Sequence, residues 1–203
     1  MRRTKAEAEE TRQNIILAAE RVFYEKGVAN SSLEDVAAVA GVTRGAIYWH
    51  FASKTDLFLA VYQHVPLPQR DMLEFESVAT GENALVELEK AACDWLELLS
   101  VDEQRQRMLT ILLRTNYSEE FQNVLRAQLE LDDFHTVHLV KAFEQARLQG
   151  RLSEGWTPES ATSAVRWLIK GMCTEWLLFG KRFDLARDGA DSMRRLFRSI
   201  VKS

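Results

Sequence analysis

The sequence predicts an all-α protein, and three observations support this fold class. Only three prolines and nine glycines interrupt the 203 residues, so few positions break a helix. Apolar residues recur at steps of three and four over long stretches, the spacing that lines one face of a helix. No segment alternates apolar and polar residues between turn residues, as a strand would. We expect about nine helices, arranged as an N-terminal three-helix helix-turn-helix domain and a larger helical domain.

Composition is ordinary for a globular protein, with 46% apolar and 28% charged residues. No run reaches about 18 apolar residues and the N-terminus lacks the apolar segment of a signal peptide, so we expect a soluble, cytoplasmic protein with no membrane partner. The net charge is −4, and residues 1–54 hold eight basic against seven acidic residues, so charge alone does not indicate a nucleic-acid partner. Cys93 and Cys173 are interpreted as buried small hydrophobes, with a redox switch as the alternative.

Start and stop signals frame the first two helices. Gly27 closes the first helix, because glycine adopts the left-handed conformation that ends helices. A capping box then begins the second helix, formed either by Ser32 with Asp35 or by Ser31 with Glu34. The N-terminus of such a helix also offers free N–H groups to a phosphate.

Residues 33–51, LEDVAAVAGVTRGAIYWHF, have the pattern of a helix-turn-helix. Gly41 stands where the backbone must turn through a positive φ, and Thr43 is placed as the N-cap of a second short helix. The first of the two helices has four apolar residues at i, i+3, i+4 and i+7, namely Leu33, Val36, Ala37 and Ala40.

The second short helix has two different faces. Ala46 and Ile47 point inward together with Phe51. The opposite face carries a guanidinium, two aromatic rings and a glycine, contributed by Arg44, Gly45, Tyr48 and Trp49. A protein core does not require this set of residues, whereas the major groove of DNA suits it.

Three segments resemble the DNA-binding domain of the TetR family of bacterial repressors: NIILAAERVFYEKGV, SSLEDVAAVAGVTRGAIYWHF and SKTDLF. GVTRGAIYWHF is especially similar to the AcrR-like branch of efflux regulators, and the resemblance covers roughly residues 4–62. It implies that Tyr48, Trp49 and His50 contact phosphates or base edges and that Lys54 contacts a backbone phosphate. Packing roles for Trp49 or His50 and a solvated Lys54 are the alternatives. The predicted DNA-binding residues are Ser32, Thr43, Arg44, Gly45, Tyr48, Trp49, His50 and Lys54.

A domain boundary is predicted near VPLPQ. The fourth helix starts at Lys54, and Pro66 and Pro68 disfavour helix in the residue before each, so this helix should stop or kink there. The sequence departs here from relatives with a longer connecting helix. We predict two domains, residues 1–62 for DNA binding and residues 63–203 for effector binding and dimerisation.

The second domain is expected to hold a small hydrophobic effector. In the helix that opens at Ser118, three hydrogen-bonding side chains share a stripe with apolar ones, a mix typical of a ligand cavity. Core or surface polar residues with satisfied hydrogen bonds are the alternative. His135 and His138 with Asp132 lack a clear further ligand, so no metal or cofactor is expected. The predicted effector-binding residues are Trp95, Met108, Thr110, Gln128, Phe134, His135, His138, Trp167 and Met172.

The last two helices are expected to form a homodimer. Thr157 and Pro158 are a start signal for the first of them, N-cap followed by proline. Both helices carry more apolar surface than one neighbour can cover, so each should pack against its own copy in a second subunit. The predicted interface residues are Val165, Leu168, Trp176, Met193, Leu196, Phe197 and Ile200.

These features together predict a homodimeric, ligand-responsive transcriptional repressor that binds a palindromic double-stranded DNA operator. The resemblance implies control of an efflux-pump or related operon and release by a hydrophobic molecule. A helical binding protein whose helix-turn-helix contacts another protein is one alternative. A helical enzyme is the other, although the sequence has no Glu-x-x-His signature of di-iron bundles and no Gly-rich phosphate motif.

Overall fold

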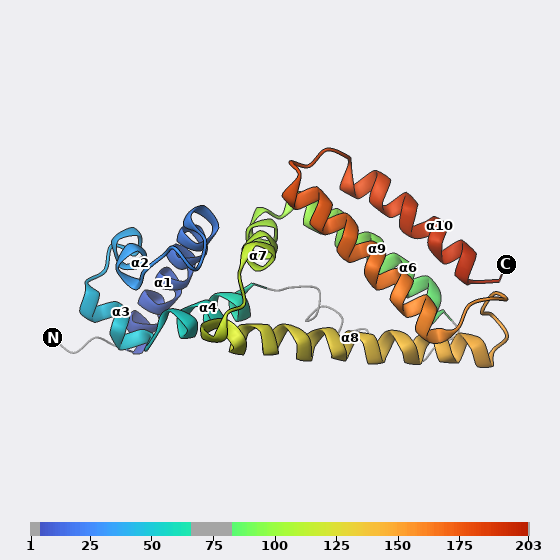
Figure 1. Ribbon diagram of the computed structural model, residues 1–203, viewed down its shortest axis with the longest axis horizontal. Coiled ribbons are helices and arrows are strands. Elements are labelled where there is room, and N and C mark those ends of the chain that lie inside the picture. Colours follow the sequence, from blue (N-terminus) through green and yellow to red (C-terminus); the bar gives the residue numbers. More distant parts are fainter. Residues whose placement is uncertain (1–4, 66–82, 203) are drawn as a thin grey trace. The chain divides into compact units, whose positions relative to one another are not determined.

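The computed structural model describes residues 5–65 and 83–202, and in this part of the chain it is all-α, as predicted (Figure 1). A 3-10 turn, η2 (Glu119–Phe121), and a π-helical turn, η3 (Leu185–Gly189), supplement the α-helices. None of the described helices has the length and apolar character needed to span a bilayer. The nine described α-helices are α1 (Lys5–Lys26), α2 (Leu33–Ala40), α3 (Arg44–His50), α4 (Lys54–His64), α6 (Ala84–Val101), α7 (Glu103–Arg114), α8 (Gln122–Leu148), α9 (Pro158–Leu178) and α10 (Ala190–Ile200).

Local capping explains why the short helices begin where they do. Ser32 Oγ accepts a hydrogen bond from Asp35 N at 3.1 Å, and the Asp35 carboxylate accepts one from Ser32 N at 2.9 Å. This is a complete capping box, so the first of the two predicted boxes is confirmed. Thr43 Oγ1 caps α3 by a single bond, accepting from Ala46 N at 3.2 Å. Between α2 and α3, Gly41 has φ 66°, where a side chain would add strain.

Contacts divide the described residues into two compact units. The N-terminal unit comprises residues 5–65 and Arg107–Gln128, and the C-terminal unit comprises residues 83–106 and 129–202. The grouping by contacts therefore assigns part of the sequence beyond residue 63 to the first unit. The predicted functional boundary between residues 62 and 63 stays a prediction.

Aromatic side chains hold the N-terminal unit together. Phe23 of α1 meets Phe58 of α4 edge to face at 5.7 Å between ring centroids, and Phe58 meets Phe121 of η2 in the same way at 5.8 Å. All three rings are fully buried, which explains why η2 belongs to this unit. Asn14 Nδ2 also donates to Ala40 O at 2.9 Å, which fixes α1 against the end of α2.

The fourth helix ends where the prolines predict. Helix α4 ends at His64, and Val65 has extended backbone angles, φ −80° and ψ 123°, as expected for a residue that precedes proline. Pro66 and Pro68 themselves lie outside the described residues.

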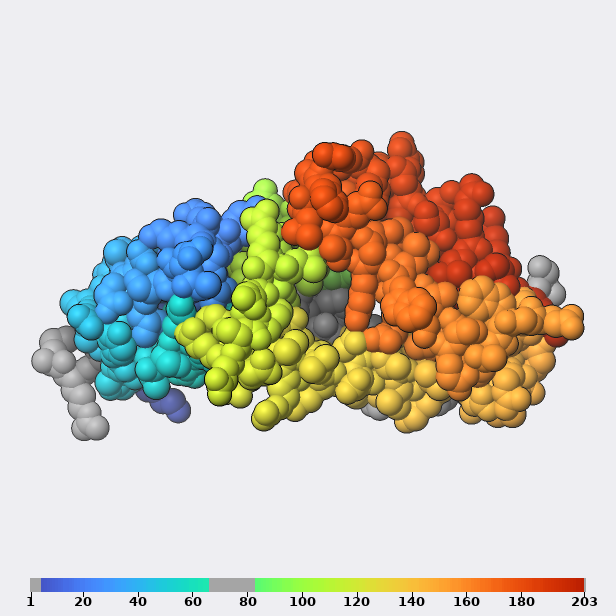
Figure 2. Space-filling view, viewed as in Figure 1, coloured from blue at the N-terminus to red at the C-terminus, as the bar shows by residue number. Residues whose placement is uncertain are grey.

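Helices α6, α9 and α10 pack on one another in the C-terminal unit, together with η3 and the later part of α8 (Figure 1). The segments of α9 and α10 adjoin on the molecular surface (orange to red in Figure 2). Their apolar stripes are covered within the chain by a shared core, because Met193 and Phe197 of α10 pack with Leu88 of α6 and Phe143 of α8. We expected these stripes to stay exposed to water unless a second subunit covered them. This was wrong, since α6, α8 and η3 cover most of them within the chain.

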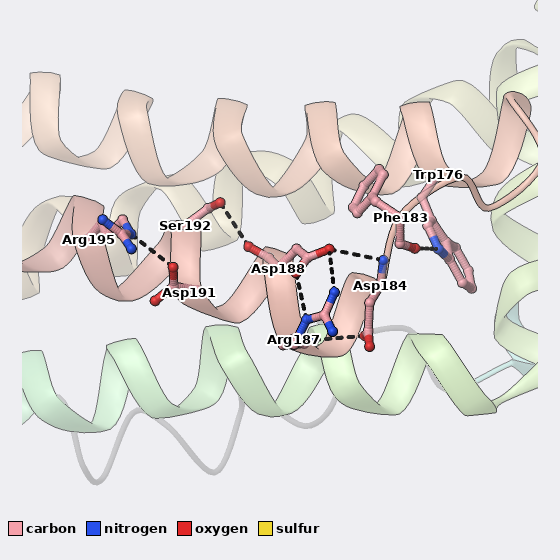
Figure 3. Close-up of polar contacts among 8 residues, drawn as sticks. All are labelled: Trp176, Phe183, Asp184, Arg187, Asp188, Asp191, Ser192 and Arg195. Carbon is pink, nitrogen blue, oxygen red and sulfur yellow. Dashed lines mark hydrogen bonds and ion pairs between the residues drawn. The ribbon is translucent and has the colours of Figure 1, made fainter.

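Polar contacts fix the connection between α9 and α10 (Figure 3). The indole Nε1 of Trp176 donates to Phe183 O at 3.0 Å, and Asp184 Oδ1 accepts from Arg187 N at 2.9 Å as the cap of η3. Ser192 Oγ donates to Asp188 O at 2.8 Å where α10 begins. These bonds satisfy backbone groups at the turn, so α10 can fold back against α9.

Candidate functional site

Helix α3 has one buried and one exposed face. Ile47 and Phe51 are 0% and 2% exposed, and Ala46 is half-buried. On the opposite face, Tyr48 and Trp49 are 44% and 72% exposed. Two adjacent exposed aromatic rings on one helix face form a surface able to contact base edges and phosphates, so this face is the candidate nucleic-acid interface.

Arg44 lies on the same exposed face as the aromatic rings. Its side chain is 73% exposed, and its guanidinium carbon lies 5.6 Å from the centroid of the Tyr48 ring. Gly45, the next residue, is exposed as well, and no atom would meet a Cβ there. The predicted grouping of Arg44, Gly45, Tyr48 and Trp49 on one face is therefore what the structure has.

His50 and Trp49 have different environments. The two rings meet edge to face at 4.5 Å, and the His50 ring also lies 6.3 Å from Phe51. His50 is half-buried, so it packs partly against the domain. Trp49 is too exposed to be a packing residue.

Lys54 is engaged inside the N-terminal unit. Its Nζ donates to Ala29 O at 3.3 Å and to Ser31 O at 3.2 Å, and it lies 5.6 Å from the centroid of Phe121. The ammonium group is thus held next to Ser32, the cap of α2, where the free N–H groups of a helix N-terminus favour an anion. Lys54 is therefore only partly solvated, because two backbone carbonyls bind its ammonium group.

Sequence reasoning missed Glu34 as a partner of the recognition face, the exposed face of α3 (the recognition helix) that carries Arg44, Gly45, Tyr48 and Trp49. Its Oε1 lies 3.0 Å from Arg44 Nε and accepts a hydrogen bond from the Tyr48 hydroxyl at 3.4 Å. The pairing joins two different helices, so helical spacing alone does not indicate it. The available signal was an acidic side chain in the first turn of the helix that precedes the recognition helix.

Three of the predicted effector residues lie together on α8. The Phe134 ring is 4.1 Å from that of His138 and 6.1 Å from that of His135. His138 Nδ1 lies 2.7 Å from Phe134 O, so that nitrogen is the donor. Burial lowers the pKa of His135 to about 4, so its ring is neutral at pH 7.

Two buried polar atoms in the C-terminal unit have no hydrogen-bond partner among the described residues. They are Nε2 of His135 and Oγ1 of Thr162, a residue that is only 1% exposed. Sequence reasoning did not select Thr162. Nearby, Asp132 is paired with Arg166 and Lys170 of α9. The described residues contain no cluster of His, Cys, Asp and Glu able to hold a metal ion.

The other predicted effector residues are divided between the two units. In the N-terminal unit, Met108 and Thr110 are buried, and Gln128 Nε2 donates to the Tyr117 hydroxyl at 2.6 Å. The hydroxyl of Tyr62 is buried there without a partner in the described part of the chain, and burial raises its pKa to about 12.

In the C-terminal unit, Met172 is half-buried and the Trp95 side chain hydrogen-bonds to the Cys173 thiol. Trp167 is 69% exposed, so in the single chain it lines no enclosed site. A groove of about 190 Å³ in the N-terminal unit contains none of the nine predicted residues. Its lining consists of Phe23, Tyr24, Glu25, Lys26, Gly27, Val28, Ile111, Arg114 and Thr115.

Most of the predicted dimer residues are buried within their own chain. Leu168 and Leu196 are half-buried. The side chains with at most 5% exposure are Val165, Trp176, Met193, Phe197 and Ile200. The reason for selecting them, apolar surface left in water, therefore does not hold, because α6, α8 and η3 already cover that surface.

Comparison with known proteins identifies the family. Residues 15–61 match the family described as bacterial regulatory proteins, tetR family. The HTH-type transcriptional repressor BepR of Brucella suis biovar 1 is 36% identical over 204 residues, covering 100% of this chain and 96% of BepR.

Two solved structures are similar over nearly the whole chain. NalD, the secondary repressor of the MexAB-OprM multidrug efflux pump in Pseudomonas aeruginosa, is 33% identical with a TM-score of 0.87, covering 98% of this chain and 100% of NalD. SmeT of Stenotrophomonas maltophilia, solved as a triclosan complex, is 30% identical with a TM-score of 0.83, covering 96% of this chain and 93% of SmeT. The chain therefore belongs to the TetR family of bacterial regulatory proteins, and it is a DNA-binding regulator of transcription, not an enzyme.

Proposed function

We propose that this protein is a cytoplasmic, homodimeric repressor that binds a palindromic operator through α3, controls an efflux-pump operon and is released by a hydrophobic small molecule. Control of efflux is supported by the names of its relatives, since NalD and SmeT are described as repressors of multidrug efflux pumps. The direct observation behind the proposal is the exposed face of α3, where Arg44, Tyr48 and Trp49 lie side by side along one helix.

Each side chain of this face has a proposed role. Arg44 reads guanine through a bidentate contact, while Tyr48, Trp49 and His50 contact phosphates or base edges. Gly45 lets the helix approach the groove closely. The starts of the two helices, at Ser32 and Thr43, offer backbone N–H groups to phosphates, and Lys54 adds positive charge beside the first of them.

A second copy of the chain completes the proposed repressor, because two recognition helices about 34–36 Å apart, or a whole-turn multiple, are needed to read two half-sites on one DNA face. Since the predicted interface side chains are mostly buried, we propose that the partner covers the exposed side of α9, where Trp167 is 69% and Leu178 37% exposed. Sedimentation should show that Trp167→Glu is monomeric and binds the operator weakly. Val137→Glu, on an exposed position of α8, should stay dimeric. Dimeric Trp167→Glu would contradict this interface.

The proposed effector site involves α8 and α9. His135 and Thr162 each present a buried polar atom without a partner among the described residues, and Phe134 supplies an aromatic ring beside His135. A largely apolar molecule with a hydrogen-bonding group suits such surroundings, because it would satisfy an atom that otherwise lacks a partner. The triclosan complex of SmeT supports a small-molecule effector.

DNA binding by variants tests the proposal. The operator is obtained by sequencing DNA that the protein retains from its own genome. Arg44→Ala should then lower affinity for the operator by about 1–3 kcal/mol per half-site contact and relax base preference at one position of each half-site. Lys54→Ala should weaken the binding of operator and random DNA alike. Affinity that does not depend on salt would instead indicate a protein partner for the helix-turn-helix.

A further inference from the structure

The base-reading role proposed for Arg44 raises a physical question about its exposed side chain. Arginine has many rotamers, and holding one of them at a base edge loses conformational entropy on binding. A side chain that is already held in place loses less. The contacts of Arg44 in the free protein therefore bear directly on how well it reads a base.

Glu34, Arg44 and Tyr48 form a closed set of contacts across α2 and α3. Glu34 Oε1 lies 3.0 Å from Arg44 Nε and 3.4 Å from the Tyr48 hydroxyl that donates to it. The Arg44 guanidinium in turn lies over the Tyr48 ring, 5.6 Å from its centroid. Each of the three side chains thus contacts the other two.

The two acidic residues that open α2 have different partners. Asp35 is used by the Ser32 cap and by Lys26 Nζ at 2.6 Å, contacts that lower its pKa to about 2, the Lys26 bond first among them. Glu34 points instead to the recognition helix. Its charge lies in the first turn of α2, where the helix dipole favours an anion, so the carboxylate is a stable anchor.

The position of the contact on the guanidinium matters. A carboxylate at Nε leaves open the edge formed by Nη1 and Nη2, which is able to donate to the O6 and N7 acceptors of one guanine. We infer that Glu34 is a positioning residue that holds Arg44 in its base-reading orientation and thereby determines operator specificity. This inference rests on the proposed base contact of Arg44.

An ordinary surface carboxylate would behave differently. A negative charge near phosphates opposes DNA binding, so removing it would strengthen binding to every sequence by the same factor. A positioning residue contributes to the affinity for the operator and not to the affinity for random DNA. The ratio of the two affinities therefore separates these roles.

The experiment measures dissociation constants for the operator and for a random duplex of equal length, at one salt concentration, by fluorescence anisotropy. The proteins are the wild type, Glu34→Ala, Glu34→Gln, Arg44→Ala and the Glu34→Ala, Arg44→Ala double variant. Glu25→Ala, an exposed acid at the end of α1, is the control. Melting temperatures of all variants establish that they are folded.

Glu34→Ala should lower the specificity ratio about fivefold, the lower end of what a bidentate base contact provides, while random DNA binds as well as before or better. Glu34→Gln, which keeps the length of the side chain and an oxygen that can accept from the Tyr48 hydroxyl, should retain more of the ratio than Glu34→Ala. In the Arg44→Ala background, Glu34→Ala should leave the ratio unchanged, because there is no side chain left to position.

Two results overturn the inference in distinguishable ways. If Arg44→Ala lowers the ratio but Glu34→Ala raises both affinities equally, Glu34 is only a surface charge and the proposed Arg44 contact stands. If Arg44→Ala itself leaves the ratio unchanged, the base contact in the proposed function fails and the role of Glu34 fails with it.

Discussion

The polar side chains of the recognition face of α3 differ from those of α8 and α9 in exposure and in pairing. Arg44 and Tyr48 are exposed and have a partner in Glu34. His135 Nε2 and Thr162 Oγ1 are buried and have none in the described chain. Exposed ion pairs are worth about 0–1 kcal/mol, so the contacts of this face contribute little to the stability of the fold and remain available for DNA binding. A buried atom without a partner destabilises the fold by about 1–3 kcal/mol, which a bound molecule can recover.

The Glu20–Arg107 pair is a third case for this comparison, an ion pair whose carboxylate is buried. Glu20 Oε1 lies 2.7 Å from Arg107 Nε, and the Glu20 side chain is only 3% exposed. Arg107→Ala should lower the free energy of unfolding by about 3 kcal/mol, because it leaves a buried carboxylate without this partner. Urea unfolding measures the change.

The matched control for that pair is exposed. Arg195 Nε lies 2.8 Å from Asp191 Oδ2, with side chains 74% and 53% exposed. Arg195→Ala should change the free energy of unfolding by less than about 1 kcal/mol. Equal losses for the two variants would contradict the view that burial decides what these pairs contribute.

His135→Phe tests the buried group without a partner, and the expected change in the free energy of unfolding is smaller. The folded-state pKa of His135 is about 4 against 6.5 for the free side chain, so between these values the unfolded chain binds more protons and the wild type loses stability as pH falls. Between pH 7 and 5 the loss attributable to His135 should be about 1–2 kcal/mol. Unfolding of wild type and variant at both pH values measures it, and the same pH dependence in the two proteins would show that burial of His135 has no such effect.

Local signals made the N-terminal helices predictable from the sequence. A cap such as Thr43 and a positive-φ turn such as Gly41 act within a few residues, so the printed order of residues contains the whole signal. The exposed face of α3 was predictable for the same reason, because its four residues lie within about one and a half turns of one helix.

Non-local pairings could not be predicted in the same way. An apolar stripe such as that of Met193 and Phe197 indicates that something covers it, but not whether the cover is α6 of the same chain or a second subunit. Glu34 with Arg44 and Glu20 with Arg107 join different helices, and Thr162 is notable only because no described group reaches its hydroxyl. Such facts depend on packing in three dimensions, which periodicity does not determine.

The central claim is that Arg44 reads a guanine in each operator half-site, and substitution of single guanines by 7-deazaguanine tests it most directly. The substitution removes the N7 acceptor and leaves base pairing intact. Affinities of wild type and Arg44→Ala are measured on operators substituted at one guanine at a time. We predict one guanine per half-site at which the substitution weakens binding of the wild type about fivefold or more and leaves Arg44→Ala unaffected. If every substitution affects both proteins equally, Arg44 does not read a base.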